Sequence, residues 1–228
     1  IDPSKKYLKA AGFKGSLKSH HEYIDEGRRP WLYRPAGSMM IPSDTWLPYP
    51  RICAHRGFNS IAPENSLPAY GAAVALGAEE IEFDVWATKD GVLVSSHDPT
   101  LDRVSDGTGK IWDYTYEELL KLDFGAKSGE AFKGLRICTF EEILKKFACT
   151  TIMNIHVKIW DFEELDHHYE DIARLIRQYN CENHCYMMSS TDKSLAEFHA
   201  IAPEIHLCVG WNGEKDDMLA MVNRAIAL

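Results

Sequence analysis

From residue 51 onward, short apolar runs alternate with longer segments in which apolar residues recur every three or four positions. Apolar runs bounded by turn residues predict strands, and the longer spacing predicts amphipathic helices. The predicted strands are 52–54, 81–85, 92–94, 151–158, 185–188 and 205–209. The predicted helices are 66–76, two that open at the Thr-x-x-Glu capping sequences of Thr115 and Thr139, 162–179, 193–202 and a last one from about 216. This alternation predicts a parallel sheet, in either a doubly wound fold or a (β/α)8 barrel.

The number of strands bears on the choice between these two folds. Six strand candidates follow residue 50, whereas a closed barrel needs eight, and the last predicted helix reaches Leu228 without a capping signal. The chain is therefore an open sheet or an α/β barrel that is truncated at its C-terminus, and the motifs below favour the barrel. On that count we expect the complete protein to continue past Leu228 by roughly fifty residues or more. Residues 1–50 lack sustained periodicity, and we expect them to form an N-terminal extension packed on a barrel domain of residues 51–228.

Composition narrows the partners and the compartment. With 25 Lys and Arg against 34 Asp and Glu, the net charge is −9, which disfavours nucleic acid as a partner. No apolar run approaches the roughly 18–20 residues of a membrane span. The six cysteines lack the spacing of a disulfide scaffold or of paired zinc knuckles, which favours a reducing, cytoplasmic location. Because the chain begins at Ile1 rather than Met, a periplasmic or secreted location stays open. The sequence indicates no oligomeric state.

Two carboxylates mark the strand predicted at 81–85. Side chains alternate along a strand, so Glu82 and Asp84 share one face, opposite Ile81, Phe83 and Val85. In a barrel the apolar side chains face the helices and the carboxylates face the interior. Two carboxylates are costly to bury together unless a cation lies between them, and a divalent metal ion is the cation that we expect. The alternative is a pair of salt bridges to Arg or Lys.

Other polar side chains are predicted to reach the same place. The alternation puts Asn154, His156 and Lys158 on one face of their strand, opposite apolar residues. His55 and His97 follow the first and third predicted strands, and barrel enzymes carry their catalytic groups at the carboxyl ends of strands. Each histidine alone has an ordinary structural explanation, but together with the two carboxylates they predict a functional site.

The predicted site lies within an ordered set of short motifs that resembles the pattern of a known family. The motifs, in chain order, are His55-Arg56-Gly57, Pro63-Glu64-Asn65-Ser66, Gly77-Ala78, Ile81-Glu82-Phe83-Asp84-Val85, Thr88-Lys89-Asp90-Gly91, His97-Asp98, Leu101-Asp102-Arg103, Gly107-Thr108-Gly109 and Leu122-Asp123-Phe124-Gly125, followed by the strand 154–158. This order resembles the glycerophosphodiester phosphodiesterase family over about residues 51–160. No single motif is specific, but the ordered set is hard to obtain by chance.

The resemblance implies a TIM barrel with a small insertion after the third strand, here about residues 99–136. It also implies metal-dependent hydrolysis of small-molecule glycerophosphodiesters to glycerol 3-phosphate and an alcohol. Carried over position by position, it assigns acid–base catalysis to His55 and His97, metal binding to Glu82 and Asp84, phosphate contacts to Arg56 and Lys158, and support of the site to Glu64 and Asn65. Such a site suits the chemistry, because a metal ion and two cationic side chains neutralise a phosphodiester that otherwise repels nucleophiles.

One position departs from the family pattern. The family usually has a third carboxylate where this sequence has His156, and an imidazole is a metal ligand as well. We therefore expect Glu82, Asp84 and His156 to hold one divalent ion, such as Mg²⁺, Ca²⁺ or Mn²⁺. Two alternatives stay open, and the second of them follows from this departure. One is a phospholipase-D-like barrel that acts on lysophospholipids or sphingolipids, with Trp86, Trp160 and Trp211 around an apolar mouth. The other is a catalytically silent phosphodiester-binding module.

Overall fold

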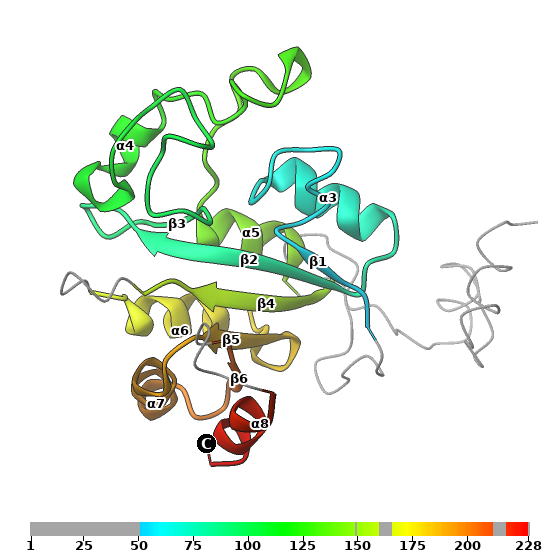
Figure 1. The fold of residues 1–228 in the computed structure, drawn as a ribbon, viewed down its shortest axis with the longest axis vertical. Helices are drawn as coiled ribbons and strands as arrows, with labels where there is room; N and C mark the ends of the chain where they lie inside the picture. The colour runs from blue at the N-terminus through cyan, green and yellow to red at the C-terminus, as the bar shows by residue number, and fades with distance from the viewer. Residues whose placement is uncertain (1–50, 149, 160–165, 212–217, 228) are drawn as a thin grey trace, which may run out of the picture.

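The computed structural model of the protein describes residues 51–148, 150–159, 166–211 and 218–227 (Figure 1). The expected N-terminal extension, residues 1–50, lies outside the described residues. The described strands are β1 Cys53–His55, β2 Glu80–Ala87, β3 Leu93–Ser95, β4 Ile152–Val157, β5 Cys185–Ser189 and β6 His206–Val209. Each of them overlaps one of the predicted strands, because short β-branched and apolar runs between turn residues specify strands locally.

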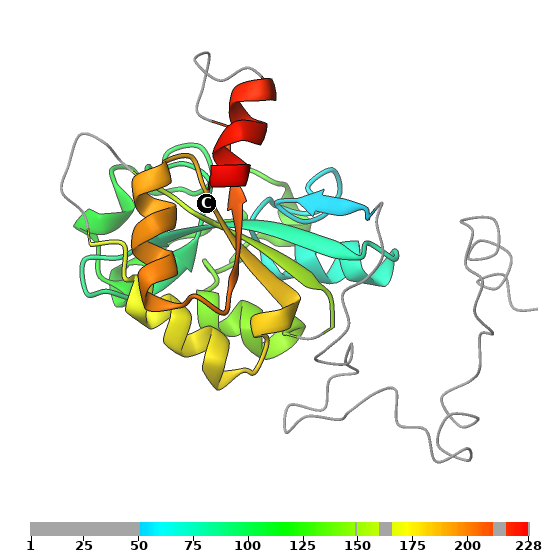
Figure 2. The same cartoon turned by 90° about the horizontal axis from the view of Figure 1, so that it is seen from below.

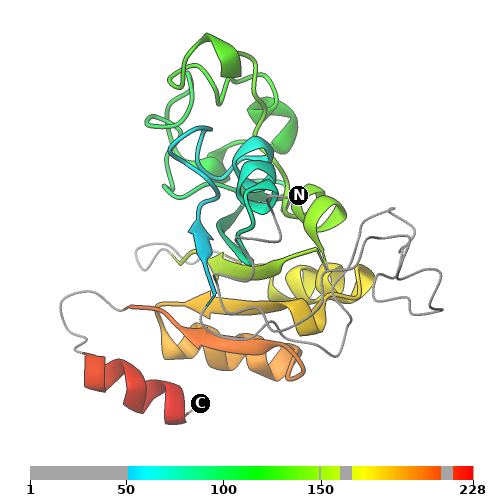
Figure 3. The ribbon, with the colours of Figure 1, turned by 90° about the vertical axis from the view of Figure 1, so that its right-hand side faces the viewer.

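Five of these strands form a parallel sheet in the order β1-β2-β4-β5-β6. Within the described part of the chain, β1 and β6 are the outer strands of this sheet, and Figure 3 shows helix α8 (Met218–Ala227) beside β6. No closed eight-stranded barrel forms within the described residues. The register places Glu82 opposite His55 on one side and Asn154 on the other, and it pairs Asp84 with His156.

Strand β3 corrects the sequence prediction. We expected it to be a third parallel strand, but it runs antiparallel to β2, with Val85 opposite Ser95 and Ala87 opposite Leu93. The connection is a tight turn closed by the Gly91 N–H, which donates to the carbonyl of Thr88 at 2.9 Å. Parallel strands need a crossover of a dozen residues or more, so this short turn permits only a hairpin. The Asp-Gly pair between two apolar runs was the hairpin signal in the sequence.

The helices lie where the polar and apolar pattern placed them, with one exception at a boundary. The α-helices other than α8 are α3 Leu67–Ala75, α4 Tyr116–Leu119, α5 Phe140–Phe147, α6 Tyr169–Gln178 and α7 Asp192–Ile201, and the 3-10 turns are η1 Ile111–Asp113, η2 Glu130–Phe132 and η3 Glu182–His184. Both predicted capping boxes form, at Thr115 with Glu118 and at Thr139 with Glu142. Helix α6 begins later than the predicted residue 162, because His168 has a left-handed backbone with φ of 50°. None of the described helices combines the length and hydropathy needed to cross a membrane.

The main core lies between the sheet and the helices on its outer face (Figure 2). Phe83 of β2 is fully buried, and its ring contacts Tyr70 of α3 at a centroid distance of 5.8 Å and Phe140 of α5 at 6.0 Å. Tyr169 of α6 packs edge-on against Phe198 of α7. The apolar face of β2 therefore points to the helices, as predicted, and its carboxylates point to the opposite face.

The predicted insertion, residues 99–136, follows β3 and carries η1, α4 and η2. Together with its flanking segments it has a small core of its own, whose buried members are Trp86, Val94, Leu101, Ile111, Leu119, Phe124 and Ile137. In Figure 1 the insertion rises beside the loop that precedes α3, at the end of the sheet toward which β2 runs. It therefore forms one wall of that end of the sheet.

Candidate active site

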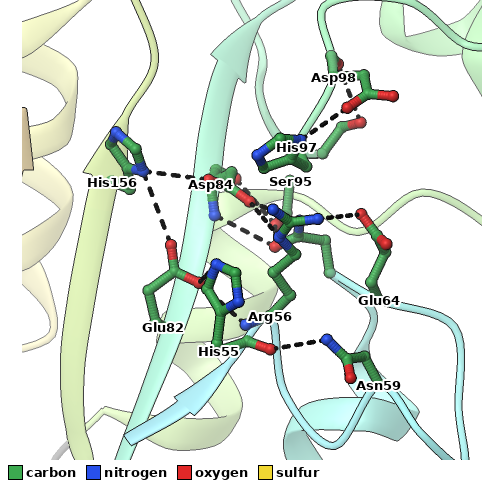
Figure 4. Close-up of polar contacts among 12 residues, drawn as sticks. His55, Arg56, Asn59, Glu64, Glu82, Asp84, Ser95, His97, Asp98 and His156 are labelled. Carbon is green, nitrogen blue, oxygen red and sulfur yellow. Dashed lines mark hydrogen bonds and ion pairs between the residues drawn. The ribbon is translucent and has the colours of Figure 1, made fainter. Parts of the chain in front are cut away.

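Two neighbouring strands supply the centre of the site. Glu82 and Asp84 of β2 are 3% and 0% exposed, and His156 of β4 lies beside both (Figure 4). His156 Nδ1 is 3.3 Å from Asp84 Oδ1 and 3.8 Å from Glu82 Oε1. One ligand atom from each of the three residues lies within 4.8 Å of the others. The structure thus brings together the three side chains that the sequence proposed as metal ligands.

Asp84 is ionised because several donors surround it. Lys158 Nζ lies 2.9 Å from Oδ1, and the Asn65 side-chain amide donates to Oδ2 at 2.8 Å. Burial by itself would raise the pKa of Asp84, but the close contact with His156 and the charge of Lys158 outweigh it and hold that pKa well below its usual value. The expected salt bridge to a lysine is therefore present at Asp84, alongside the candidate metal cluster.

Glu82 has fewer partners. One carboxylate oxygen, Oε2, accepts the backbone N–H of Arg56 at 2.9 Å and lies 3.8 Å from His55 Nε2, whereas Oε1 has no hydrogen-bond partner among the described residues. Burial, and then the charge of Asp84, raise the pKa of Glu82 above its usual value. A buried carboxylate oxygen without a donor is costly, and a bound cation would remove that cost.

The loop after β1 holds its polar residues in unusual backbone conformations. Arg56 and Asn65 have φ of 59° and 53°, in the left-handed region that side chains other than glycine rarely adopt. Gly57, with φ of 78°, lies so close to α3 that an added Cβ would be 2.7 Å from the carbonyl carbon of Ala69. Strained residues of this kind persist where a function requires them, and here the strain turns the Arg56 N–H toward Glu82.

The two cationic side chains lie on either side of Asp84. Arg56 Nε is 3.9 Å from Asp84 Oδ2, and Arg56 Nη1 donates to Glu64 at 3.2 Å. Lys158 follows β4 directly and also lies 3.2 Å from His156 Nδ1. Burial lowers the pKa of His156, so its imidazole is neutral at pH 7, the form that binds metal ions.

The two predicted catalytic histidines flank the carboxylates. His55 is exposed over 66% of its side chain, and burial, followed by the Arg56 charge, lowers its pKa. His97 lies on the other side of Asp84 from His156 (Figure 4). Its Nδ1 is 2.7 Å from Asp98 Oδ1, a contact that fixes the orientation of the ring. His97 reaches this position because the antiparallel β3 leads back along β2 to the level of Asp84.

A charged bridge that the sequence analysis did not assign connects His97 to the loop before α3. Arg103 donates to Asp98 Oδ2 at 2.6 Å and to both Glu64 oxygens at 2.8 and 2.7 Å. The hydrogen bonds from Arg103 lower the pKa of Asp98 to about 2 and also lower the pKa of Glu64. Asp98 and Arg103 were within quoted motifs, but nothing in a sequence says that Arg103 reaches a residue 39 positions away.

Tyr70 and Ser95 were also missed, since each resembles an ordinary core residue in the sequence. The Tyr70 hydroxyl donates to Asn65 Oδ1 at 2.9 Å, and Ser95 Oγ donates to the Asp84 carbonyl at 2.9 Å. They orient the amide of Asn65 toward Asp84.

Of the three tryptophans singled out in the sequence, Trp86 is 5% exposed and packs on Trp112 at a ring-centroid distance of 5.4 Å, and both line a cavity of about 240 Å³ that Lys158 also borders. Trp211, which follows β6, is 62% exposed, and Trp160 lies outside the described residues.

Comparison with known sequences agrees with the family resemblance that the motifs indicated. The sequence profile of the Glycerophosphoryl diester phosphodiesterase family matches residues 55–226. The chain is 39% identical over 162 residues to a glycerophosphodiester phosphodiesterase of Caldanaerobacter subterraneus subsp. tengcongensis, covering 70% of this chain and 65% of that protein. It is 35% identical over 163 residues to a glycerophosphodiester phosphodiesterase of Bacillus altitudinis, again covering 70% and 65%. The chain thus spans slightly less than two thirds of these curated relatives.

Solved structures agree with the fold. A glycerophosphodiester phosphodiesterase from Agrobacterium tumefaciens str. C58 superposes with a TM-score of 0.64 and 31% identity, covering 70% of this chain and 66% of that one. A phosphodiesterase from Oleispira antarctica, solved in complex with the product sn-glycerol-3-phosphate, gives a TM-score of 0.65 and 28% identity, covering 70% and 65%. Structures of this kind are TIM barrels, which confirms the predicted barrel fold, and the described residues contribute five of its parallel strands.

Proposed function

The chain belongs to the glycerophosphoryl diester phosphodiesterase family, and from this premise we propose that it hydrolyses glycerophosphodiesters to glycerol 3-phosphate and an alcohol. The observation that carries the proposal is the set of two imidazoles, His55 and His97, around a buried pair of carboxylates with cationic side chains beside it. A phosphodiester needs both charge neutralisation and proton transfer, and this one group of residues offers both.

The side chains of Glu82, Asp84 and His156 fit a divalent ion. Two carboxylates and one neutral imidazole are hard and intermediate donors, and Glu82 Oε1 has no donor of its own in the described structure. When bound, such an ion supplies positive charge next to the phosphodiester oxygens, which favours attack at phosphorus. The ligand set stays a proposal, as does the identity of the ion.

The remaining residues complete a mechanism. Arg56 and Lys158 lie beside Asp84 and would contact the phosphate oxygens, so that the negative charge that grows on them in the transition state is stabilised. One of His55 and His97 accepts a proton from the attacking water, or from the neighbouring glycerol hydroxyl, in which case a water then opens the cyclic phosphate to glycerol 3-phosphate. The other donates a proton to the departing alkoxide. Glu64 holds Arg56 and Arg103, and Asn65 holds Asp84, so both act by positioning.

The test is turnover of glycerophosphocholine, with release of glycerol 3-phosphate measured by a coupled assay. We expect activity that is lost after treatment with EDTA, restored by excess divalent ion, and lost in Lys158→Gln. Lys145→Gln, a change of an exposed lysine on α5, is the matched control and should leave turnover intact.

Other results would favour the alternatives. Hydrolysis of lysophosphatidylcholine without activity on glycerophosphocholine would favour the phospholipase-D-like function. Binding of glycerol 3-phosphate without turnover of either substrate would indicate a silent binding module.

A further inference from the structure

A cavity of about 610 Å³ lies beside the proposed site, between the loop that precedes α3 and the insertion. This volume is within the range of about 300–1,000 Å³ that is usual for small-molecule sites. Its wall contains His97 and Asn65, so it borders the catalytic group and the residue that holds Asp84. Glu82, Asp84 and His156 do not line it. His97 therefore lies at the border between these carboxylates and the cavity.

The charges in the wall are unbalanced. Glu64 is the one carboxylate among the lining residues, and it is already bound by Arg103 and Arg56. Lys127 and Arg136 also line the cavity, and neither forms an ion pair with a described residue; the Lys127 ammonium donates to the carbonyl oxygen of Asp102. After the internal pairs are formed, two positive charges at the cavity therefore lack an ion pair with any described residue, although the charge of Arg136 also acts on the more distant carboxylate of Asp123.

The interior of the cavity is suited to a compact organic group. Phe124, Phe132 and Leu135 of the insertion contribute apolar surface, while Ser96 and Ser128 offer hydroxyl groups. A quaternary ammonium group is usually bound by aromatic rings and a carboxylate. Here the single carboxylate is engaged and the two additional charges have the same sign as an ammonium, so such a group would be repelled.

We propose that this cavity receives the alcohol part of the substrate and selects alcohols that carry a negative charge of their own, such as a second phosphate. The proposal rests on the proposed phosphodiesterase function and specifies its substrate class. Lys127 and Arg136 are the specificity-determining residues. They attract an anionic alcohol and repel a cationic one, so both affinity and discrimination follow from the same two charges.

The experiment compares three glycerophosphodiesters that differ in the charge of the alcohol. These are glycerophosphoglycerol 3-phosphate, glycerophosphoglycerol and glycerophosphocholine. At low salt we expect kcat/KM to fall in that order, with about a tenfold difference between the first and the last. Added salt should shrink the difference, since both cations are exposed.

Variants assign the preference to its residues. In the double variant Lys127→Gln/Arg136→Gln the preference should drop to less than about threefold, and in Lys127→Glu/Arg136→Glu it should reverse. The matched control is Lys133→Gln, because Lys133 is an exposed lysine of the same segment that does not line the cavity. An unchanged order in the double variants, or an equal loss on all three substrates, would overturn the proposal.

Binding separates this proposal from the proposed function. Calorimetric titration of the same three compounds into His55→Asn, whose substituted residue lies outside the cavity wall, reports the charge preference without turnover. If no compound is hydrolysed by the unmodified chain but the affinities still follow the expected order, the proposed function fails and the charge selectivity stands. If all three are hydrolysed at similar rates and bind with similar affinity, the function stands and the charge selectivity fails.

Discussion

Strand β2 carries three buried carboxylates on one face. The carboxylate at the start of the strand and the two toward its other end differ in their hydrogen-bond and ion-pair partners. At the start of the strand, Glu80 is 4% exposed, and both of its oxygens are used: Arg51 Nε donates to Oε2 at 2.9 Å, and the Tyr186 hydroxyl donates to Oε1. Toward the other end, Glu82 and Asp84 lie together, and Glu82 Oε1 has no hydrogen-bond partner among the described residues.

The difference separates a structural carboxylate from functional ones. Glu80 is neutralised by the guanidinium of Arg51, whose side chain is 2% exposed, and its other oxygen accepts the Tyr186 hydroxyl. Around Glu82 and Asp84 the cations are shared with other partners, and the excess negative charge stays at the site. Burial of a carboxylate therefore does not by itself indicate a metal site. What indicates one is that the protein's own donors and cations leave a carboxylate oxygen without a partner.

The largest expected effect concerns the end of the strand with Glu82 and Asp84. Alanine in place of His55 or His97 should reduce turnover by about 10²–10⁴-fold, because each change removes one proton-transfer group. The melting temperature should stay close to that of the unmodified chain, since both side chains are partly exposed. Circular dichroism and the coupled assay check this together. A variant that keeps a rate near that of the unmodified chain would remove its histidine from the mechanism.

A pair of isosteric changes contrasts the two ends directly. Asp84→Asn should lower turnover by about 10³-fold, because a bound ion contributes several kcal/mol to the transition state. Its free energy of unfolding should change by less than about 1 kcal/mol, since relief of the repulsion from Glu82 offsets the lost Lys158 pair.

Glu80→Gln should give the opposite result. Stability should fall by about 2 kcal/mol because the buried hydrogen bond from Arg51 then meets a neutral amide instead of a carboxylate, while the kcat of the folded fraction is retained. Urea unfolding and the coupled assay on both variants measure the contrast. Equal losses of activity in the two variants would refute the distinction between the ends.

A substitution of His156 is expected to have a smaller effect, on which metal ions support activity. Two carboxylates and an imidazole carry less negative charge than three carboxylates, and imidazole suits the later transition metals. We therefore expect Mn²⁺, Co²⁺ or Zn²⁺ to support activity better than in a relative with three carboxylates, and His156→Glu to shift the preference toward Ca²⁺ or Mg²⁺. Activity over a series of metal ions, with both proteins, checks this. Identical rankings would show that His156 is not a ligand.

The smallest expected effect comes from the bridge between Asp98 and Arg103. The hydrogen bonds from Arg103 hold the pKa of Asp98 near 2, below its usual value, so the stability from this pair is complete above about pH 5 and is lost as the pH falls toward 2. The difference in unfolding free energy between the unmodified chain and Asp98→Asn should therefore be constant near neutral pH and shrink in acid. It should not exceed about 1 kcal/mol, because the pair is partly exposed and therefore screened by solvent. Urea titrations at several pH values measure it.

The sequence by itself determined the local features of this protein. Alternation along 81–85 gave the two faces of β2, and the Thr-x-x-Glu sequences gave two helix starts, because both depend on residues at most four positions apart. Together with the ordered motifs, this placed His55, His97, Glu82, Asp84 and His156 in one predicted site.

Tertiary structure decided which groups meet. The direction of β3 was still a local matter, since the Asp-Gly turn before it is in the sequence, but the contact of Arg103 with Glu64 depended on how the insertion packs against the loop before α3. The contrast between Glu80 and Glu82 was equally hidden, because both occupy the same periodic positions in one strand. What distinguishes them is that Arg51 and Tyr186 reach Glu80 from other strands and segments, and such partners are selected by the three-dimensional packing of the chain rather than by the spacing of residues along it.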